Sequence, residues 1–202
     1  MDDADPTPAA APRRGAYPKG VARRREILAR AIEVFAAKGS ERTSLRAIAE
    51  AIGVSHAALL HYFSSREELL VEVLRERENS YRAQDAERDP GEIVGIMVEA
   101  AHRNAAVPGL VSLYSNMLAA SLEDGKDYSR EYFATRFEGL RSKLISRIEA
   151  GQAAGTVRAD LEPQAMAALV IAASDGLQIQ WLLDPDIDIE KSLALLDRLL
   201  EN

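Results

Sequence analysis

Residues 45–64 read LRAIAEAIGVSHAALLHYFS, and this stretch decides the fold. Apolar residues recur at helical spacing on both sides of Gly53, a residue that readily takes the positive φ of a tight turn between two helices. Ala49 is small enough to lie where the two helices cross, and Ser55 follows the turn as a good N-cap. The stretch therefore predicts a helix-turn-helix whose structural positions are Ile48, Ala49, Ile52, Gly53, Val54 and Leu59.

The second helix of this pair, from His56 to about Tyr62, is expected to enter the major groove of duplex DNA. An imidazole can donate a hydrogen bond to a purine N7, and alanine or leucine can contact the methyl group of thymine. The outward positions expected to read bases are His56, Ala57, Leu60 and His61. The positions expected to hold phosphates around this helix are Thr43, Ser44, Arg46, Tyr62 and Arg66.

The distribution of charge agrees with a nucleic-acid-binding segment, although the whole chain carries a net charge of −7. Residues 12–66 hold 11 basic and four acidic side chains, whereas residues 67–202 hold 14 basic and 25 acidic ones. A basic segment joined to an acidic remainder is typical of a protein that contacts phosphates through one part only. A solvated, arginine-rich helix face is the alternative interpretation of the same charges.

The rest of the chain shows helical spacing of apolar residues and no sustained period-two alternation, which predicts an all-α fold of about nine helices. Residues 1–18, rich in proline and alanine, are expected to form a disordered arm. Residues 19–66 would form the helix-turn-helix domain and residues 67–202 a second helical domain. A helix that starts near Ser129 is expected to end at Gly151 and Gly155.

Composition and apolar runs also predict where the protein works. The chain has no cysteine, which excludes disulfides, thiolate metal sites and thiol nucleophiles. No signal peptide is recognisable at the N-terminus, and the longest apolar run, residues 165–173, is much shorter than the roughly 20 residues needed to cross a bilayer. A cytoplasmic protein without a membrane partner is therefore expected.

The run TSLRAIAEAIGVSHAALLHYFSSREELL, followed by an acidic helical region, resembles the TetR family of transcriptional regulators. The resemblance implies a homodimeric bacterial repressor that binds a pseudo-palindromic operator and is released by a small, largely apolar effector. By position it carries DNA contacts over to Thr43, Ser55, His56, Ala57, His61, Tyr62 and Arg66. Two residues depart from the pattern: Leu60 stands where the family usually has tyrosine, which removes a phosphate-reaching hydroxyl, and Arg66 stands where lysine is common.

The second domain holds two further predicted sets of residues. The resemblance implies an effector pocket, for which the expected lining is Met97, His102, Tyr114, Met117, Phe133 and Phe137. The last two helices carry apolar residues that a single chain would leave without a partner and that a two-fold interface would bury, namely Met166, Leu169, Val170, Ala173, Leu177, Trp181, Leu193, Leu196 and Leu200. Such a dimer would place two recognition helices about 34–36 Å apart, one turn of B-DNA.

Other functions for the same residues are disfavoured by their context. Residues 53–57 approach the nucleophile-elbow pattern, but an elbow follows a strand and the preceding residues here are helical. Glu99 and His102 have the spacing of a di-iron ligand pair, but the second pair that such a site needs is missing from the sequence. We therefore expect no catalytic residue, metal or cofactor. A helical carrier or enzyme with this fold, and a DNA-binding regulator without an effector, remain the alternatives.

Overall fold

The computed structural model describes residues 18–38, 44–86 and 93–201, and within these ranges it contains nine α-helices. They are α1 (Pro18–Lys38), α2 (Leu45–Ile52), α3 (His56–Tyr62), α4 (Arg66–Ala86), α5 (Gly95–Ala105), α6 (Leu110–Ala120), α7 (Asp127–Ala154), α8 (Pro163–Leu183) and α9 (Ile189–Leu200). The predicted all-α fold is confirmed. Residues 1–17 of the expected arm lie outside the described ranges, and Pro18 is the first residue of α1.

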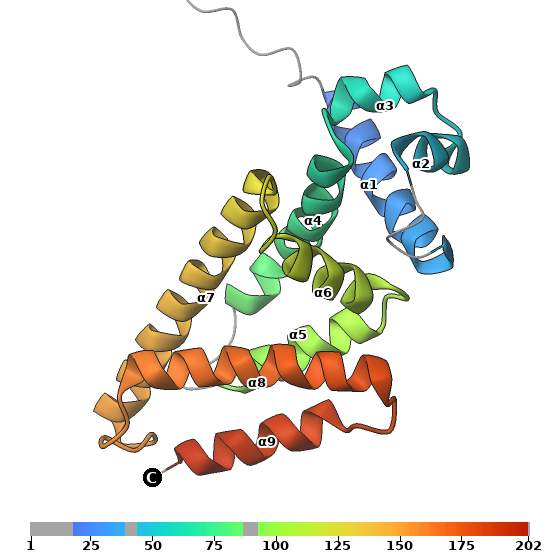
Figure 1. Ribbon diagram of the computed structural model, residues 1–202. Coiled ribbons are helices and arrows are strands. Elements are labelled where there is room, and N and C mark those ends of the chain that lie inside the picture. The colour runs from blue at the N-terminus through green and yellow to red at the C-terminus, as the bar shows by residue number, and fades with distance from the viewer. Residues whose placement is uncertain (1–17, 39–43, 87–92, 202) are drawn as a thin grey trace, which may run out of the picture.

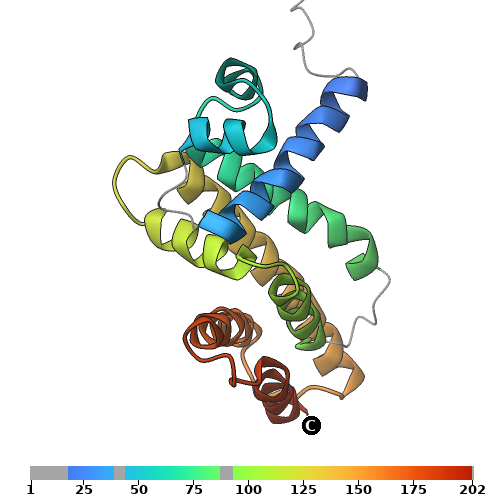
Figure 2. The same cartoon turned by 90° about the vertical axis from the view of Figure 1, so that its right-hand side faces the viewer.

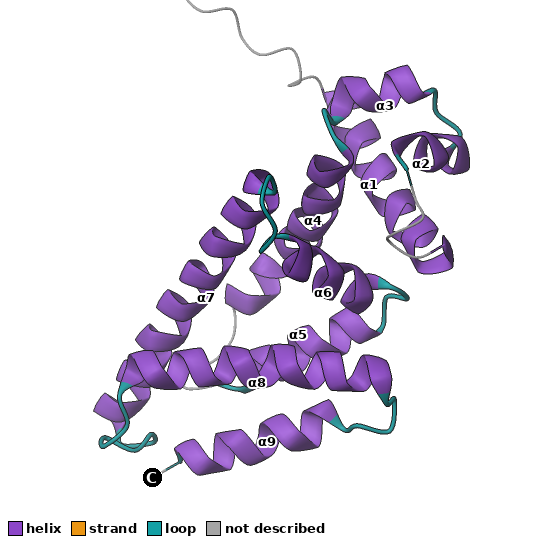
Figure 3. Cartoon of the chain, viewed as in Figure 1, coloured by secondary structure: helices purple, strands orange, loops and turns teal. Residues whose placement is uncertain are grey.

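The helix-turn-helix and the last two helices lie at opposite ends of the molecule (Figure 1). α2 and α3 lie at one end, α8 and α9 lie at the other, and α4 and α7 run along the length between them. The view turned by 90° shows the same separation (Figure 2), and the colouring by secondary structure shows how short most of the connecting loops are (Figure 3). A surface on α3 and a surface on α8 and α9 can therefore serve different partners.

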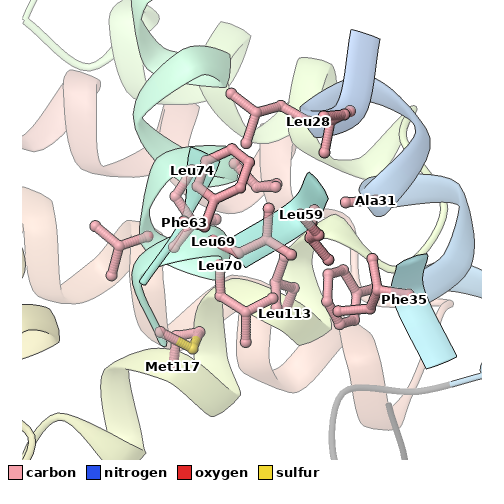
Figure 4. Close-up of a cluster of buried hydrophobic side chains, with 14 of the residues drawn as sticks. Leu28, Ala31, Phe35, Leu59, Phe63, Leu69, Leu70, Leu74, Leu113 and Met117 are labelled. Carbon is pink, nitrogen blue, oxygen red and sulfur yellow. The ribbon is translucent and has the colours of Figure 1, made fainter. Parts of the chain in front are cut away.

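A first hydrophobic cluster joins the N-terminal helices to α6 and α7. Phe35 of α1, Leu59 of α3 and Leu70 of α4 are all buried in it, together with Leu113 and Met117 of α6. Figure 4 shows these side chains converging from the separate helices. A single packed cluster therefore crosses from the helix-turn-helix into the rest of the chain.

A second hydrophobic cluster holds α5, α7, α8 and α9 together. Ile148 of α7, Val170 of α8 and Leu193 of α9 are completely buried in it. Two parts of the long helix α7 contribute to different clusters, since Phe133 belongs to the first and Leu144 to the second. The chain therefore has two packed regions, and α7 belongs to both.

The C-terminal end of α7 confirms one of the two glycines expected there, Gly155, and corrects the other, Gly151. The helix continues through Gly151 to Ala154 and ends at Gly155, which has a φ of 75°. A Cβ atom on Gly151 would lie 2.5 Å from Cγ2 of Val157, so this glycine allows the chain after α7 to pack closely against the helix. Sequence spacing could not distinguish a glycine that ends a helix from one that makes room for a neighbour.

Candidate functional site

The turn between α2 and α3 is built around Gly53, which adopts φ 75° and ψ 35°. No atom outside its immediate neighbours lies within 4 Å of the place where its Cβ would be, so the left-handed backbone alone favours glycine here. The N–H groups of Gly53 and Val54 donate to the carbonyl oxygens of Glu50 (3.1 Å) and Ala49 (2.9 Å). From α1, Arg30 donates to the carbonyl oxygen of Ile52 at 3.2 Å, a contact that the sequence analysis did not identify.

Serine hydroxyls cap both short helices of the motif. Ser44 Oγ accepts from the N–H of Ala47 at 3.2 Å, and Ser55 Oγ accepts from the N–H of Ala58 at 3.0 Å. Each cap satisfies one of the amides that a helix start leaves without a partner. The hydroxyl hydrogen of each serine remains available to donate to a phosphate oxygen.

The outer face of α3 is exposed where the sequence predicts contact with bases. His56, Ala57, Leu60 and His61 are exposed, with Leu60 retaining 42% of its accessible surface. Leu59, on the opposite side of the helix, is fully buried. The short helix is therefore held by its inner face and presents the other face to a partner.

The predicted phosphate-holding residues surround this face with different degrees of exposure. Ser44 and Arg46 are exposed, and Tyr62 is half-buried with its ring edge-to-face against His61, the centroids 5.6 Å apart. Arg66 is also half-buried, and burial lowers its pKa from the ordinary value. Thr43 lies outside the described residues.

Part of the basic charge of the N-terminal segment is neutralised within the molecule. Arg24 of α1 forms an ion pair with Glu72 of α4 and lies over the ring of Phe63, 4.9 Å from its centroid. Arg25 pairs with Glu76 of α4 at 3.1 Å. The sequence charge count overestimates the positive field of this region, because these two cations face acidic side chains of α4.

Glu72 links three helices through hydrogen bonds and was missed by the sequence analysis. Its buried carboxylate accepts from Arg24 on α1, from Arg75 on its own helix at 2.8 Å and from the Tyr128 hydroxyl on α7 at 3.1 Å. The local sequence does not identify Glu72 as a linking residue, because Arg24 lies 48 residues and Tyr128 lies 56 residues away from it in the chain.

A cavity of about 1310 Å³ lies between α4, α5, α6 and α7. It borders both hydrophobic clusters, because its lining includes Leu74 and Leu110 of the first and Met97 and Leu144 of the second. Ligand sites in proteins typically occupy about 300–1,000 Å³, so this space is large enough for a small organic molecule.

The cavity takes a different lining from the one expected from sequence. Of the six residues predicted, only Met97 and Tyr114 line it. Met117 and Phe133 are buried in the first cluster, and Phe137 packs against both clusters. His102 is exposed at the surface, with Nε2 3.1 Å from Glu190 Oε2. The spacing identified apolar helix faces correctly but could not say which part of each face would be covered by a neighbouring helix.

Arg136 of α7 is a largely buried cation beside the cavity. It forms an ion pair with Glu78 of α4 and lies 5.0 Å from the centroid of the Tyr114 ring. Burial alone would lower the pKa of Arg136, but Tyr114 and Glu78 outweigh it and raise that pKa above its ordinary value. The Tyr114 hydroxyl donates to Asp175 Oδ2 at 3.2 Å, and burial raises the pKa of Tyr114. These polar contacts connect the cavity wall to α4 and α8.

The predicted dimer residues lie mostly on the inward face of α8 and α9, which corrects the sequence expectation. Met166, Val170, Leu193 and Leu200 are buried inside their own chain. Ala173, Leu177, Trp181 and Leu196 are partly buried against the second cluster. A side chain already covered by its own chain has little area left for a second subunit to cover. Only Leu169 of the predicted set is well exposed, at 58%.

Another set of apolar residues faces outward and is here called the outer α8–α9 face. It consists of the exposed residues Ala165, Leu169, Ala172, Ile179 and Leu183 of α8, the half-buried Gly176 on the same stripe, and the exposed Leu195 and Leu199 of α9. The α8 members recur at steps of four and three residues and therefore form one stripe along the helix. Among the described helices, α8 alone is long and apolar enough to cross a bilayer by length and composition. One such helix is weak evidence for a membrane span, and α8 packs against α5, α6, α7 and α9.

The residues that suggested enzymatic sites have structural partners. Ser55 caps α3, and helix α2 precedes the turn where a nucleophile elbow would need a strand. Glu99 lies 3.8 Å from Arg103 on the same helix, whereas His102 contacts Glu190 of α9. Neither pattern is assembled into the constellation that its chemistry requires.

Comparison with known proteins gives matches along most of the chain. The model for bacterial regulatory proteins of the tetR family matches residues 27–73, and the model for the C-terminal region of BetI-type transcriptional repressors matches residues 96–202. The HTH-type transcriptional repressor Rv1474c of Mycobacterium tuberculosis is 29% identical over 183 residues, covering 90% of this chain and 92% of that protein. The repressor KstR2 of Mycolicibacterium smegmatis is 41% identical over 54 residues, 27% of this chain and 26% of its own length.

Solved structures share the fold at lower identity. A TetR transcription regulator from Haloarcula marismortui superimposes with a TM-score of 0.78 at 17% identity, covering 90% of this chain and 100% of that one. A regulator from Saccharomonospora viridis, solved in complex with choline, gives a TM-score of 0.70 at 22% identity over 89% of this chain and 95% of its own. At these identities the matches show a shared fold over most of the chain.

Proposed function

Because this chain belongs to the TetR family of bacterial regulatory proteins and is a DNA-binding transcriptional repressor, we propose that it binds a pseudo-palindromic operator as a homodimer and leaves it when a small molecule enters the cavity. The observation that carries this proposal is the exposed outer face of α3, held by a left-handed glycine turn and two serine caps. In this assignment His56, Ala57, Leu60 and His61 read bases. Ser44, Ser55, Arg46, Tyr62 and Arg66 hold phosphates, and the protein acts in the cytoplasm, where bacterial DNA lies.

A second copy of the chain is the partner proposed for the outer α8–α9 face. Soluble monomers rarely expose several large apolar side chains on one surface, and Leu169, Leu183 and Leu199 each retain more than half of their accessible area. Two-fold pairing of such a face would join α8 and α9 of each subunit into a four-helix interface. Since α3 lies at the opposite end of the chain, this pairing leaves both recognition helices accessible to DNA (Figure 1).

Release by an effector is supported by the position of the cavity. α4 supplies part of the cavity wall and begins at Arg66, four residues after α3 ends. Arg75 faces the cavity and also donates to Glu72, which in turn holds Arg24 of α1. A molecule that shifts α4 would therefore move the recognition helix, provided that it binds more tightly to the arrangement that fits DNA poorly.

The test is binding of the purified protein to its own upstream DNA, followed by fluorescence anisotropy over a series of salt concentrations. Arg46→Ala should weaken binding to every sequence and lower the salt slope by about one, because it removes one phosphate contact. His61→Ala should instead reduce discrimination between bases by about 1–3 kcal/mol at one position of the site.

Arg141→Ala is the matched control, because Arg141 is an exposed cation on α7 outside the proposed interface. It should leave both the affinity and the salt slope unchanged. The division into phosphate-holding and base-reading residues would be refuted if Arg46→Ala and His61→Ala altered binding identically. The assignment of α3 would be refuted if neither variant affected binding.

A further inference from the structure

We propose that the cavity binds an anionic amphiphile, a molecule with a carboxylate or phosphate group on an apolar body, and that Arg77 of α4 and Arg103 of α5 hold its charged group. The inference rests on the proposed function, since it assigns the chemical class of the effector to the cavity described above. It also revises the expectation of a largely apolar effector, because it adds a charged group to the ligand.

The described residues that line the cavity carry more positive than negative charge. Six of them are cationic: Arg75, Arg77, Arg103, Arg136, Lys143 and Arg147. The acidic lining residues are Glu78 and Glu131, and Glu78 is already paired with Arg136. Arg75 and Arg103 also have carboxylate partners just outside the lining, Glu72 at 2.8 Å and Glu99 at 3.8 Å, so the excess of positive charge is smaller than the count of lining cations. A partly enclosed space with this excess of cations favours an anion and disfavours a cation.

Arg77 and Arg103 form a pair of like charges at one side of this space. Their guanidinium carbons lie 4.5 Å and 4.2 Å from the centroid of the same ring, that of Tyr81. Arg77 also donates to the backbone carbonyl oxygen of Arg103 at 3.1 Å, which fixes the two residues relative to each other. Burial, and then the positive charge of Arg103, lower the pKa of Arg77. An oxyanion bound beside both groups would relieve this repulsion.

Arg77 has hydrogen-bonding capacity that the described part of the chain does not use. Its Nε is buried and has no acceptor among the described residues, and no described carboxylate forms an ion pair with it. A buried donor without an acceptor is costly, and a guanidinium offers its donors in a planar fork that matches two oxygens of a carboxylate or phosphate. Arg77 therefore has both the charge and the geometry to bind an oxyanion.

The aromatic rings of the cavity also argue against a cationic ligand. Quaternary ammonium groups are bound over the faces of aromatic rings. Here Tyr81 lies beneath Arg77 and Arg103, Tyr114 beneath Arg136, and Tyr132 beneath Arg75 at 5.7 Å. The protein's own arginines thus already occupy ring faces that an ammonium ligand would need, in contrast to what a choline-binding site requires.

The rest of the lining suits an apolar body attached to the anion. Met97, Leu110, Val111, Leu140 and Leu144 all line the cavity. A ligand whose charged group binds both Arg77 and Arg103 would also join α4 to α5. Its binding would thereby act on α4, the helix that follows the recognition helix in the chain.

The experiment uses four probes with the same ten-carbon chain, kept below the concentrations at which they form micelles: decanoate, decyl phosphate, decyltrimethylammonium and decanol. Isothermal titration calorimetry with the full-length protein gives each affinity, and operator binding is measured in parallel. At least one of the two anions should bind tenfold or more tightly than decanol and decyltrimethylammonium. The comparison of decanoate with decyl phosphate identifies which oxyanion is preferred.

Variants locate the binding of the charge. Arg77→Gln should weaken the preferred anion about tenfold and leave decanol unchanged, because one charge-assisted contact is lost. Arg77→Lys, which keeps the charge but loses the planar fork, should bind the preferred anion more tightly than Arg77→Gln does and less tightly than the parent protein, so that a folding defect in Arg77→Gln does not prevent the test. Arg141→Gln removes an exposed cation outside the cavity and should leave anion binding unchanged.

Three outcomes would overturn the inference: tighter binding of decyltrimethylammonium than of both anions, no binding of any probe, or equal loss of anion binding in Arg77→Gln and Arg141→Gln. Failure of the proposed function has a different signature. If an anion binds through Arg77 but operator affinity does not change, the ligand class stands and release by an effector fails. If decanol or the cation releases DNA, release stands and the anion assignment fails.

Discussion

Substituting Leu199 by aspartate should separate the proposed dimer into monomers. Leu199 lies on the outer α8–α9 face and retains 61% of its accessible surface in the single chain. Complete burial of a leucine side chain is worth about 1.5–3 kcal/mol, so burial of the remaining surface by a partner contributes about 1–2 kcal/mol. A two-fold interface contains two copies of the residue, which raises the loss to about 2–4 kcal/mol per dimer.

This loss corresponds to a roughly 30-fold to several-hundred-fold rise in the dissociation constant of the dimer, at about 1.4 kcal/mol per factor of ten. Burial of two aspartate side chains would increase it further. Sedimentation velocity at a series of protein concentrations measures the change directly. Operator affinity should fall in parallel, because two linked recognition helices bind two half-sites more tightly than one.

Leu122→Asp is the matched control, since Leu122 is 76% exposed but lies in the turn after α6, away from the outer α8–α9 face. This variant should remain a dimer, and both variants should unfold at nearly the same urea concentration as the parent protein. A Leu199→Asp protein that sediments as the parent dimer does, or a Leu122→Asp protein that dissociates equally, would refute the assignment of this face.

Three further variants test the packing that positions the site. Ser55→Ala should destabilise the protein by about 1 kcal/mol in urea unfolding and weaken operator binding, because α3 loses its N-cap; unchanged stability would show that the cap contributes nothing. Gly151→Ala should destabilise the protein by about 1–3 kcal/mol, since the new Cβ would clash with Val157. Its control, Gly139→Ala on the same helix, has open space around the new Cβ and should stabilise the protein by roughly 0.5–1 kcal/mol. Equal effects of the two substitutions would contradict the close packing at Gly151. Glu72→Gln should destabilise by about 1–2 kcal/mol in the same assay by weakening its links to α1 and α7; a variant as stable as the parent would remove Glu72 from the proposed coupling.

The helix-turn-helix was predictable because its determinants are local. Gly53, the residues that cap the two helices and the alternation of buried and exposed positions all lie within about 20 residues, and each acts on its own turn of the chain. The exposure of His56, Ala57, Leu60 and His61 follows from the burial of Leu59 between them. The family assignment followed from the same stretch.

The lining of the cavity and the polar contacts around it could not be predicted from local sequence. Which part of an apolar helix is covered depends on helices that are distant in sequence. Spacing therefore predicted Met117, Phe133 and Met97 alike as cavity-lining residues, although only Met97 lines the cavity and the other two are buried in the first cluster. Glu72 and Arg77 look like ordinary surface charges in a helix until α1, α5 and α7 are placed around α4.

The amino-acid order alone determined the all-α fold and the helix-turn-helix motif, because helix starts, turns and amphipathic stripes are short-range properties of the chain. Tertiary packing alone decided which side of α8 faces the core. That helix carries apolar residues all around its circumference, so its sequence offers two equivalent stripes. The choice between them came from α5, α7 and α9, which cover Val170 and Met166 and leave Leu169 and Leu183 in solvent.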